Sequence, residues 1–169
     1  MRIAVAACGC DGPRDLAREL AEEASELGIE LALGGCWGLM GEVVEEASKR
    51  GVKVKVFIPI NSSCPLSVDV IETNMTPNMR SALLVTSSDA LLALGGGAGT
   101  LMEVLMAYRE GKPVAAVRGW GFDTDPYFEL MAKNGIDSRK LSEVGVFESP
   151  REALHWLWRK LKGKTSSRE

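Results

Sequence analysis

Short apolar runs alternate with segments whose apolar residues recur at helical spacing. Apolar runs of four to seven residues predict strands, and recurrence every three or four residues predicts helices. The strands are expected over residues 2–7, 29–33, 52–58, 68–72, 89–94, 114–117 and 144–147. The helices are expected from Pro13 to Leu27, up to Gly51, over 78–87, 100–110 and 126–133, and from Pro150 onward.

This order of elements predicts the fold class. Strands that alternate with helices form a mainly parallel sheet with helices on both faces. We therefore expect an α/β fold: a single Rossmann-like, doubly wound domain of about six to seven strands over residues 1–163. Residues 164–169 are expected to form a frayed C-terminal tail. In such a fold the loops at the carboxyl ends of the strands make the ligand site.

Composition narrows the class of protein. The chain has 169 residues, of which 46% are hydrophobic and 25% charged, and a net charge of −3. This profile is typical of one soluble globular domain. Because the chain has no basic block and no apolar run near the ~20 residues that span a bilayer, we expect neither nucleic acid nor a membrane as a partner. The apolar start, residues 1–7, is shorter than the core of a signal peptide, so we expect a cytoplasmic protein.

A glycine-rich stretch follows the predicted strand 89–94 and opens the next helix. Residues 95–99 read Gly-Gly-Gly-Ala-Gly. Glycines accept positive φ, and a helix N-terminus behind them presents free N–H groups and a partial positive charge. No Walker sequence follows, and Met102 stands where a dinucleotide fingerprint has its third glycine. We interpret the stretch as a phosphate site, against the alternative of a plain tight turn.

Two charged residues accompany this stretch, and each has two interpretations. Arg80, in the first turn of the helix predicted over 78–87, is a surface arginine or a guanidinium that reaches an anionic ligand. Glu103 completes the capping-box pattern Thr100-x-x-Glu103, in which it ties back the start of its own helix. Alternatively, Glu103 faces the ligand as a general acid or base, or stabilises positive charge on a sugar.

The cysteines are expected to be thiols near the mouth of the site. They are Cys8, Cys10, Cys36 and Cys64. They form no Cys-x-x-Cys pair, and cytosolic chains rarely keep disulfides. Because Cys-x-Cys spacing is weak evidence for a metal and small buried cysteines are common, we expect no metal site.

Other aromatic and titratable residues leave alternatives open. Trp37, in a glycine loop, is expected to stack on a base or to contact a partner subunit. The irregular segment 119–140 carries four aromatic residues and is expected to form a lid or a subunit contact. The single histidine, His155, lies on the last predicted helix, which argues against a histidine-based triad.

Taken in order along the chain, several motifs resemble one known family. These motifs are Gly34-Gly35, Gly38-Leu39-Met40-Gly41, Arg80, Ser88-Asp89-Ala90 and Gly96-Gly97-Ala98-Gly99-Thr100-Leu101-Met102-Glu103. The set resembles the Lonely Guy (LOG) family and its relatives, the molybdenum cofactor carrier proteins and a branch of unassigned function. The resemblance covers roughly residues 1–118.

The resemblance implies a Rossmann-like fold, usually a homodimer or higher homo-oligomer, that binds a nucleoside 5′-monophosphate. LOG enzymes cleave its N-glycosidic bond to base and ribose 5-phosphate. By motif position, Arg80 and Glu103 correspond to the catalytic arginine and glutamate. The resemblance and the loop positions together assign phosphate or nucleotide binding to Gly9, Cys10, Gly35, Met79, Gly96, Gly97, Ala98, Gly99 and Thr100. No cofactor is required, and the bound ligand is expected to be a nucleotide or a phosphorylated pterin cofactor.

Three departures from the LOG pattern indicate the carrier-like or unassigned branch. Gly95 stands where LOG proteins have proline, and Ser81 where they have lysine. The first loop reads Cys8-Gly9-Cys10-Asp11 in place of Cys-Gly-Ser-Ser. The primary expectation is a LOG-like phosphoribohydrolase, and the alternative is a carrier protein without catalysis.

Overall fold

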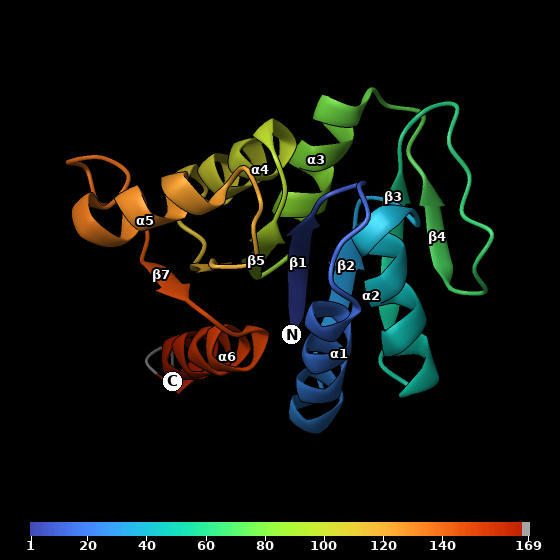
Figure 1. Cartoon of the computed structure of the whole chain (residues 1–169), viewed down its shortest axis with the longest axis horizontal. Coiled ribbons are helices and arrows are strands. Elements are labelled where there is room, and N and C mark those ends of the chain that lie inside the picture. Colours follow the sequence, from blue (N-terminus) through green and yellow to red (C-terminus); the bar gives the residue numbers. More distant parts are fainter. Residues whose placement is uncertain (167–169) are drawn as a thin grey trace.

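The computed structural model describes the backbone of residues 1–166 and the side chains of residues 1–163, and it confirms the α/β fold. Its strands form one seven-stranded sheet in which all neighbouring pairs are parallel. The strands are β1 (Arg2–Ala7), β2 (Glu30–Leu33), β3 (Val54–Ile58), β4 (Asp69–Glu72), β5 (Ala90–Gly95), β6 (Val114–Val117) and β7 (Val144–Phe147). The helices are α1 (Arg14–Leu27), α2 (Gly38–Lys49), α3 (Pro77–Thr86), α4 (Ala98–Arg109), α5 (Asp125–Asn134) and α6 (Pro150–Ser166) (Figure 1).

The strand order creates a switch point at the centre of the sheet. The order is β4-β3-β2-β1-β5-β6-β7, so the chain moves outward from β1 to β4 and then returns to place β5 beside β1. Strands β1 and β5 pair from Ile3 and Ala90 to Ala7 and Gly95. In doubly wound sheets, ligands bind in the crevice beyond the carboxyl ends of the strands at such a point.

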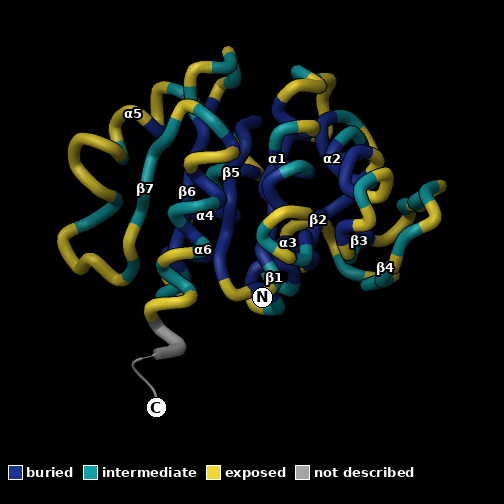
Figure 2. Tube along the Cα trace, turned by 90° about the horizontal axis from the view of Figure 1, so that it is seen from below, coloured by how far each residue is buried: buried dark blue, intermediate teal, exposed yellow. Residues whose placement is uncertain are grey.

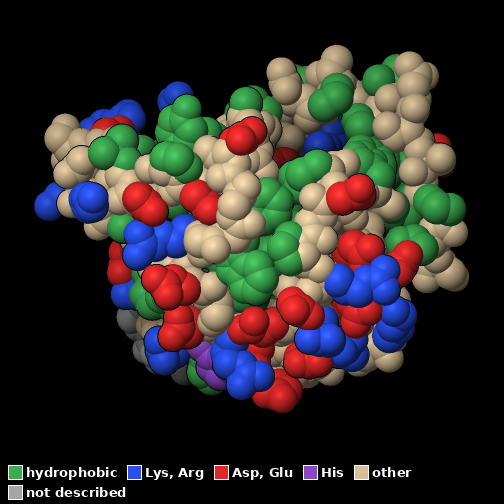
Figure 3. Space-filling view, viewed as in Figure 1, with side chains coloured by type: hydrophobic (Ala, Val, Ile, Leu, Met, Phe, Trp, Pro, Cys, Tyr) green, Lys and Arg blue, Asp and Glu red, His purple; other side chains and the backbone are tan. Residues whose placement is uncertain are grey.

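Helices cover both faces of the sheet. Helices α1, α2 and α6 lie on one face, and α3, α4 and α5 on the other (Figure 1). Residues of β1 alternate between the two cores: Ile3 and Val5 face the first set of helices, and Ala4 and Ala6 the second. Burial on both faces explains the continuous apolar runs of the central strands (Figure 2). Charged side chains crowd the outer surface over α1 and α2 (Figure 3).

Local signals position several helix ends as predicted. Gly28 closes α1 in the left-handed conformation, with φ of 64°. The Thr76 side chain accepts a hydrogen bond from the Met79 N–H and caps α3. The Ser149 hydroxyl accepts a hydrogen bond from the Glu152 N–H at 3.2 Å and caps α6.

The predicted start of α4 is wrong by two residues, and this excludes the capping box. The helix begins at Ala98, with Gly97 as its cap and no side-chain cap bond. Thr100 therefore lies inside the first turn, and Glu103 lies beyond it, too far along the helix to cap its start. In place of a capping interaction, Glu103 accepts hydrogen bonds from Arg80 and Ser81 of α3.

The C-terminus also differs from its prediction. Helix α6 continues to Ser166, so residues 164–166, expected in the tail, are helical. Residues 167–169 lie outside the described residues. No helix within residues 1–166 is both long and apolar enough to cross a bilayer.

The expectation of thiols is wrong, because all four cysteines form disulfides. Cys8 pairs with Cys10, with 5.1 Å between their Cα atoms, and Cys36 pairs with Cys64, with 5.3 Å. Both separations lie in the usual range for a disulfide. The sheet places the loop after β2 beside the loop between β3 and β4, which brings Cys36 to Cys64. Sequence spacing alone does not reveal that approach.

Candidate functional site

A cleft of about 650 Å³ opens at the switch point between β1 and β5. Its walls are the loops that follow β1, β2, β5 and β6, together with the first turns of α3 and α4. The polar and charged side chains that line it are Cys8, Cys10, Asp11, Asn78, Arg80, Ser81, Thr100, Glu103 and Asp123. The cleft thus lies where the topology predicts a ligand site.

Arg80 lies in the wall of the cleft, in the first turn of α3. Its side chain is only 10% exposed. The guanidinium packs on the backbone of Gly34, where an added Cβ would stand 1.6 Å from Nη1. Any other residue at Gly34 would displace the arginine. The Arg80 Nε is buried and has no hydrogen-bond partner among the described residues, which is costly unless a ligand accepts from it.

Glu103 faces Arg80 across the junction of α3 and α4. The Ser81 hydroxyl donates to Glu103 Oε1 at 2.7 Å, and Arg80 Nη1 donates to the same oxygen at 3.3 Å. The described residues provide no donor to Oε2. Burial raises the pKa of Glu103 above its ordinary value and lowers the pKa of Arg80, because both lose hydration. Both members of this pair therefore keep hydrogen-bonding capacity that the described residues do not use, and both lie beside an open cleft.

The glycine loop between β5 and α4 has backbone angles that favour glycine. Gly95 has φ of 126° and Gly96 has φ of 157°. A Cβ on Gly95 would lie 2.2 Å from the Phe122 ring, and one on Gly96 would lie 2.5 Å from Thr100 Oγ1. Glycine is therefore required both for conformation and for space.

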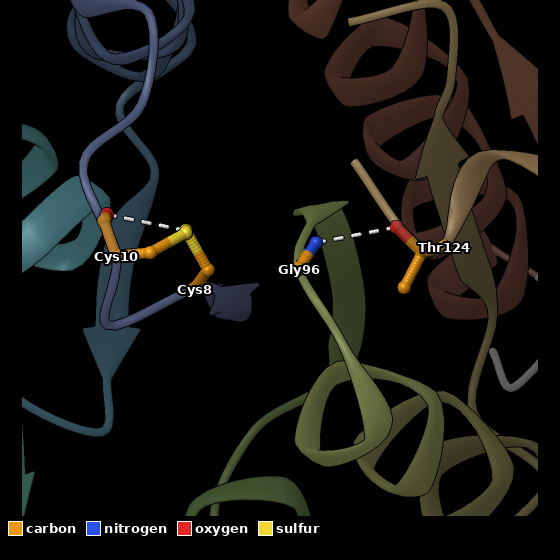
Figure 4. Close-up of a disulfide and its surroundings, with 4 residues drawn as sticks. All are labelled: Cys8, Cys10, Gly96 and Thr124. Carbon is orange, nitrogen blue, oxygen red and sulfur yellow. Dashed lines mark hydrogen bonds between the residues drawn. A yellow bond between two sulfur atoms is a disulfide. The ribbon is translucent and has the colours of Figure 1, made fainter. Parts of the chain in front are cut away.

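Only part of this loop is available to an anion. The Gly96 N–H donates to Thr124 Oγ1 at 3.2 Å (Figure 4), and the Thr124 N–H donates to the Gly96 carbonyl at 3.1 Å. The first intrahelical bond of α4 runs from the Leu101 N–H to the Gly97 carbonyl. The N–H groups of the first turn, from Ala98 to Thr100, have no intrahelical acceptor and remain for a phosphate.

Most of the predicted site residues meet in the cleft. Those that line it are Gly9, Cys10, Arg80, Gly96, Gly97, Gly99, Thr100 and Glu103. Three do not: Gly35 is buried beneath the Trp37 ring, Met79 is 59% exposed beside the cleft, and the Ala98 side chain is exposed outside it. The positions of these three residues have one cause, since neighbours in sequence point to different sides of a loop or helix. The backbone N–H of Ala98 still belongs to the first turn of α4.

Several residues of the site were not predicted from the sequence. Ser81 was noted only as a departure from a motif, yet it is the nearest donor to Glu103. Asn78 and Asp123 line the cleft, and Thr124 supports the glycine loop. The signal for Asp123 and Thr124 was their place after β6, at the same edge of the sheet as the glycine loop.

Aromatic side chains form opposite parts of the cleft wall. Trp37 is 38% exposed and lies against Gly9 and Gly35, where added Cβ atoms would stand 2.6 Å from its ring atoms. Trp120 and Phe122 come from the loop after β6. The segment 119–140, which was expected to form a lid or a subunit contact, therefore contributes to the cleft.

The cleft has few positive charges. Arg80 is the one lysine or arginine among the described lining residues, and it is already paired with Glu103. Asp11 and Asp123 add exposed carboxylates. A phosphate would thus rely on the N-terminus of α4. Within the described part of the chain, no three His, Cys, Asp or Glu side chains are grouped to hold a metal ion.

The fold and the cleft define a Rossmann-like protein with a ligand site at its switch point. The chain belongs to the SLOG cluster4 family, whose model matches residues 5–153. An uncharacterised protein of Archaeoglobus fulgidus is 35% identical over 160 residues, covering 92% of this chain and 93% of its relative. A rice protein (Oryza sativa subsp. japonica), probable cytokinin riboside 5′-monophosphate phosphoribohydrolase LOGL1, is 29% identical and covers 92% of this chain and 74% of its own length.

Solved structures share the fold. The protein TM1055 superposes with a TM-score of 0.83 at 28% identity, covering 94% of this chain and 98% of that one. The molybdenum cofactor binding protein from Rippkaea orientalis superposes with a TM-score of 0.77 at 24% identity, covering 95% and 96%. The family model confirms the expected LOG-like superfamily, and the likeness to the molybdenum cofactor binding protein shows a shared fold.

Proposed function

We propose that the protein is a phosphoribohydrolase that cleaves the N-glycosidic bond of a nucleoside 5′-monophosphate. The single observation that carries this proposal is the buried Arg80–Glu103 pair, set in one cleft with the N-terminus of α4. A phosphate on that terminus would place the attached ribose within the same cleft. The LOG relatives, whose names state this activity, support it.

Each residue has a role in this reaction. The first-turn N–H groups of α4 hold the phosphate. As the bond between the base and ribose C1′ breaks, its electron pair leaves with the base and C1′ becomes positively charged. The Glu103 carboxylate stabilises this charge and orients the water that adds to C1′. The proton that this water loses balances the negative charge that the departing base takes with the electron pair. Arg80, whose Nε lacks an acceptor in the protein, holds the ligand against Glu103.

The test is release of free base. Wild-type protein is incubated with AMP and with N6-substituted analogues, and the base is separated by chromatography. Adenosine, which lacks the phosphate, is the matched substrate control. We expect base from the monophosphates and none from adenosine. Absence of base from the whole panel would contradict hydrolysis.

Non-catalytic carriage of a phosphorylated ligand is a second candidate. The observation that favours it is that Ser81 and Arg80 both donate to Glu103 Oε1, so the protein itself partly neutralises the carboxylate. Native mass spectrometry of protein purified from its own host tests this function. A retained phosphorylated pterin would support carriage, and protein that is empty while it hydrolyses AMP would contradict it.

The helices beside the cleft are the basis for a proposed homodimer. Met79 on α3 and Leu105 on α4 are 59% and 44% exposed, and the two helices pack side by side. Apolar side chains of this size on adjacent helices are typical of a subunit contact. Sedimentation should give a dimer for the wild type and a monomer for Leu105→Glu.

A further inference from the structure

The two disulfides lie in different surroundings. Cys8 and Cys10 both line the cleft, with Cys8 buried and Cys10 exposed. Their bridge spans only two positions along the chain, which constrains the unfolded chain little. Cys36 and Cys64 are separated by 28 positions, and neither is among the described residues that line the cleft. The first bridge therefore adds little constraint to the chain but is placed next to any ligand.

We propose that Cys8 and Cys10 form a reversible thiol–disulfide site that controls ligand binding in the cleft, with a dithiol as its redox partner. The inference rests on the proposed function in one respect, since it requires a phosphorylated ligand at the start of α4.

The exchange proceeds by two thiolate attacks. A thiolate of the dithiol attacks the exposed Cys10 sulfur, the Cys8–Cys10 bond breaks, and its electron pair leaves on Cys8. The second sulfur of the dithiol then attacks the first, which is bonded to Cys10 in the mixed disulfide. The bond to Cys10 breaks, and Cys10 leaves as a thiolate that takes up a proton. The dithiol is oxidised to a disulfide, and the protein gains two electrons and one proton, which is on Cys10. The other proton goes to solvent, and Cys8 remains a thiolate.

Cys8 lies directly against the glycine loop. A Cβ on Gly96 would stand 3.1 Å from the Cβ of Cys8 and 3.3 Å from its Cα. Figure 4 shows Cys8 and Cys10 beside Gly96, at the ends of the neighbouring strands β1 and β5. Because Gly96 directly precedes the cap of α4, a Cys8 thiolate formed on reduction is stabilised by the same N-terminus that binds the phosphate. Reduction thus replaces a neutral disulfide with a competing negative charge.

The loop that holds the disulfide also supports the wall of the cleft. The Cys10 carbonyl accepts a hydrogen bond from the Leu39 N–H at 2.8 Å, at the start of α2. Gly9, between the two cysteines, packs on the indole of Trp37. Opening of the bridge frees this loop and changes the surroundings of Trp37, so redox state and the shape of the cleft change together.

Coupling of this kind is reciprocal. If reduction weakens binding of a phosphorylated ligand by some factor, the ligand must make reduction harder by the same factor. We expect a factor of about ten, a common size for coupling between two sites. The change in Kd on reduction and the shift in the reduction midpoint with ligand are measured independently, and the two factors must agree.

The test compares oxidised protein with protein reduced by dithiothreitol. Thiols are counted by alkylation and peptide mass spectrometry, indole emission is recorded, and the Kd for ribose 5-phosphate is measured by calorimetry. Cys36→Ser/Cys64→Ser keeps only the cleft disulfide and should behave like the wild type. Cys8→Ser/Cys10→Ser should not respond to dithiothreitol at the cleft, and Trp37→Phe should lose the emission change.

The outcomes separate this inference from the proposed function. The inference predicts reversible reduction of Cys8–Cys10, a Kd about tenfold weaker after reduction, and an equal shift in the dithiothreitol midpoint when ligand is present. A disulfide that resists dithiothreitol in the folded protein, or an equal Kd in both states, would overturn the inference alone. Absence of ribose 5-phosphate binding in both states would overturn the coupling together with the proposed phosphate site.

Discussion

Two of the three buried glutamates among the described residues, Glu23 and Glu103, differ in their surroundings. Glu23 joins α1 to α6, and its side chain is 1% exposed. Arg151 Nε lies 2.6 Å from its Oε1, and His155 Nε2 lies 2.7 Å from its Oε2. Glu103 has both of its donors on one oxygen, and its cationic partner Arg80 is itself buried.

This difference is the basis for our proposal that Glu23 has a structural role and Glu103 a functional one. Each oxygen of Glu23 has a partner, and the side chains of Arg151 and His155 reach water, so the group is satisfied at low cost. Glu103 leaves one oxygen without a donor from the described residues, and Arg80 leaves one buried N–H without an acceptor. Incomplete pairing beside an open cleft is what a ligand completes.

The largest effect is expected on catalysis. Glu103→Gln should lower kcat for base release by about 10³-fold, because the amide cannot stabilise positive charge at C1′ as the carboxylate does. Glu23→Gln, the matched control, should leave kcat unchanged. Equal loss in both variants would mean that neither carboxylate acts on substrate and that both support the fold.

The next effect concerns the two disulfides and their contributions to the free energy of unfolding. Loop-closure entropy predicts that loss of the Cys36–Cys64 bridge destabilises the fold by about 3.6 kcal/mol, against about 1.6 kcal/mol for Cys8–Cys10. Urea unfolding of the two double serine variants measures both. A larger cost for Cys8→Ser/Cys10→Ser would show that the bridge in the cleft is a structural one.

A smaller effect is expected at the junction of α1 and α6. Glu23→Ala removes the acceptor for Arg151 and His155, and both partners are exposed enough to be rehydrated. We expect a loss of about 2 kcal/mol in the free energy of unfolding, with base release unchanged. A loss of base release in this variant would contradict the claim that Glu23 supports only the fold.

The smallest effect is a pH dependence of stability. Burial raises the pKa of Glu103 in the folded state above the ordinary value of 4.5. The folded state then holds the proton more tightly than the unfolded state, so stability falls as pH rises from about 4.5 through the folded pKa. Glu103→Gln should lack this decline. A wild type whose stability rises over that interval relative to the variant would contradict the direction of the shift.

The sequence was sufficient for the fold and for placing Arg80 and Glu103 at the same edge of the sheet. Strand runs such as Ala90–Leu94 and caps such as Thr76 are local signals, and the local signals agree with the topology. Arg80 and Glu103 were found because both follow from motif position, and the order of the strands brings their helices together.

Contacts between residues far apart in the sequence could not be predicted from local patterns. The bond from Ser81 to Glu103 and the Cys36–Cys64 bridge join positions 22 and 28 residues apart, and no local rule encodes them. The departure at Gly95 is explained only by structure: its φ of 126° is closed to proline, and the Phe122 ring fills the space of a side chain. The glycine at this position is therefore explained by its backbone conformation and by its contact with Phe122, in the loop after β6.

The most direct test of the account is a crystal structure of Glu103→Gln with AMP bound. The account predicts the phosphate on the first-turn N–H groups of α4, from Ala98 to Thr100, and the ribose beside Arg80 and the substituted residue 103. A phosphate held elsewhere, or a ribose turned away from Arg80, would contradict the assignment of this pair to the reaction.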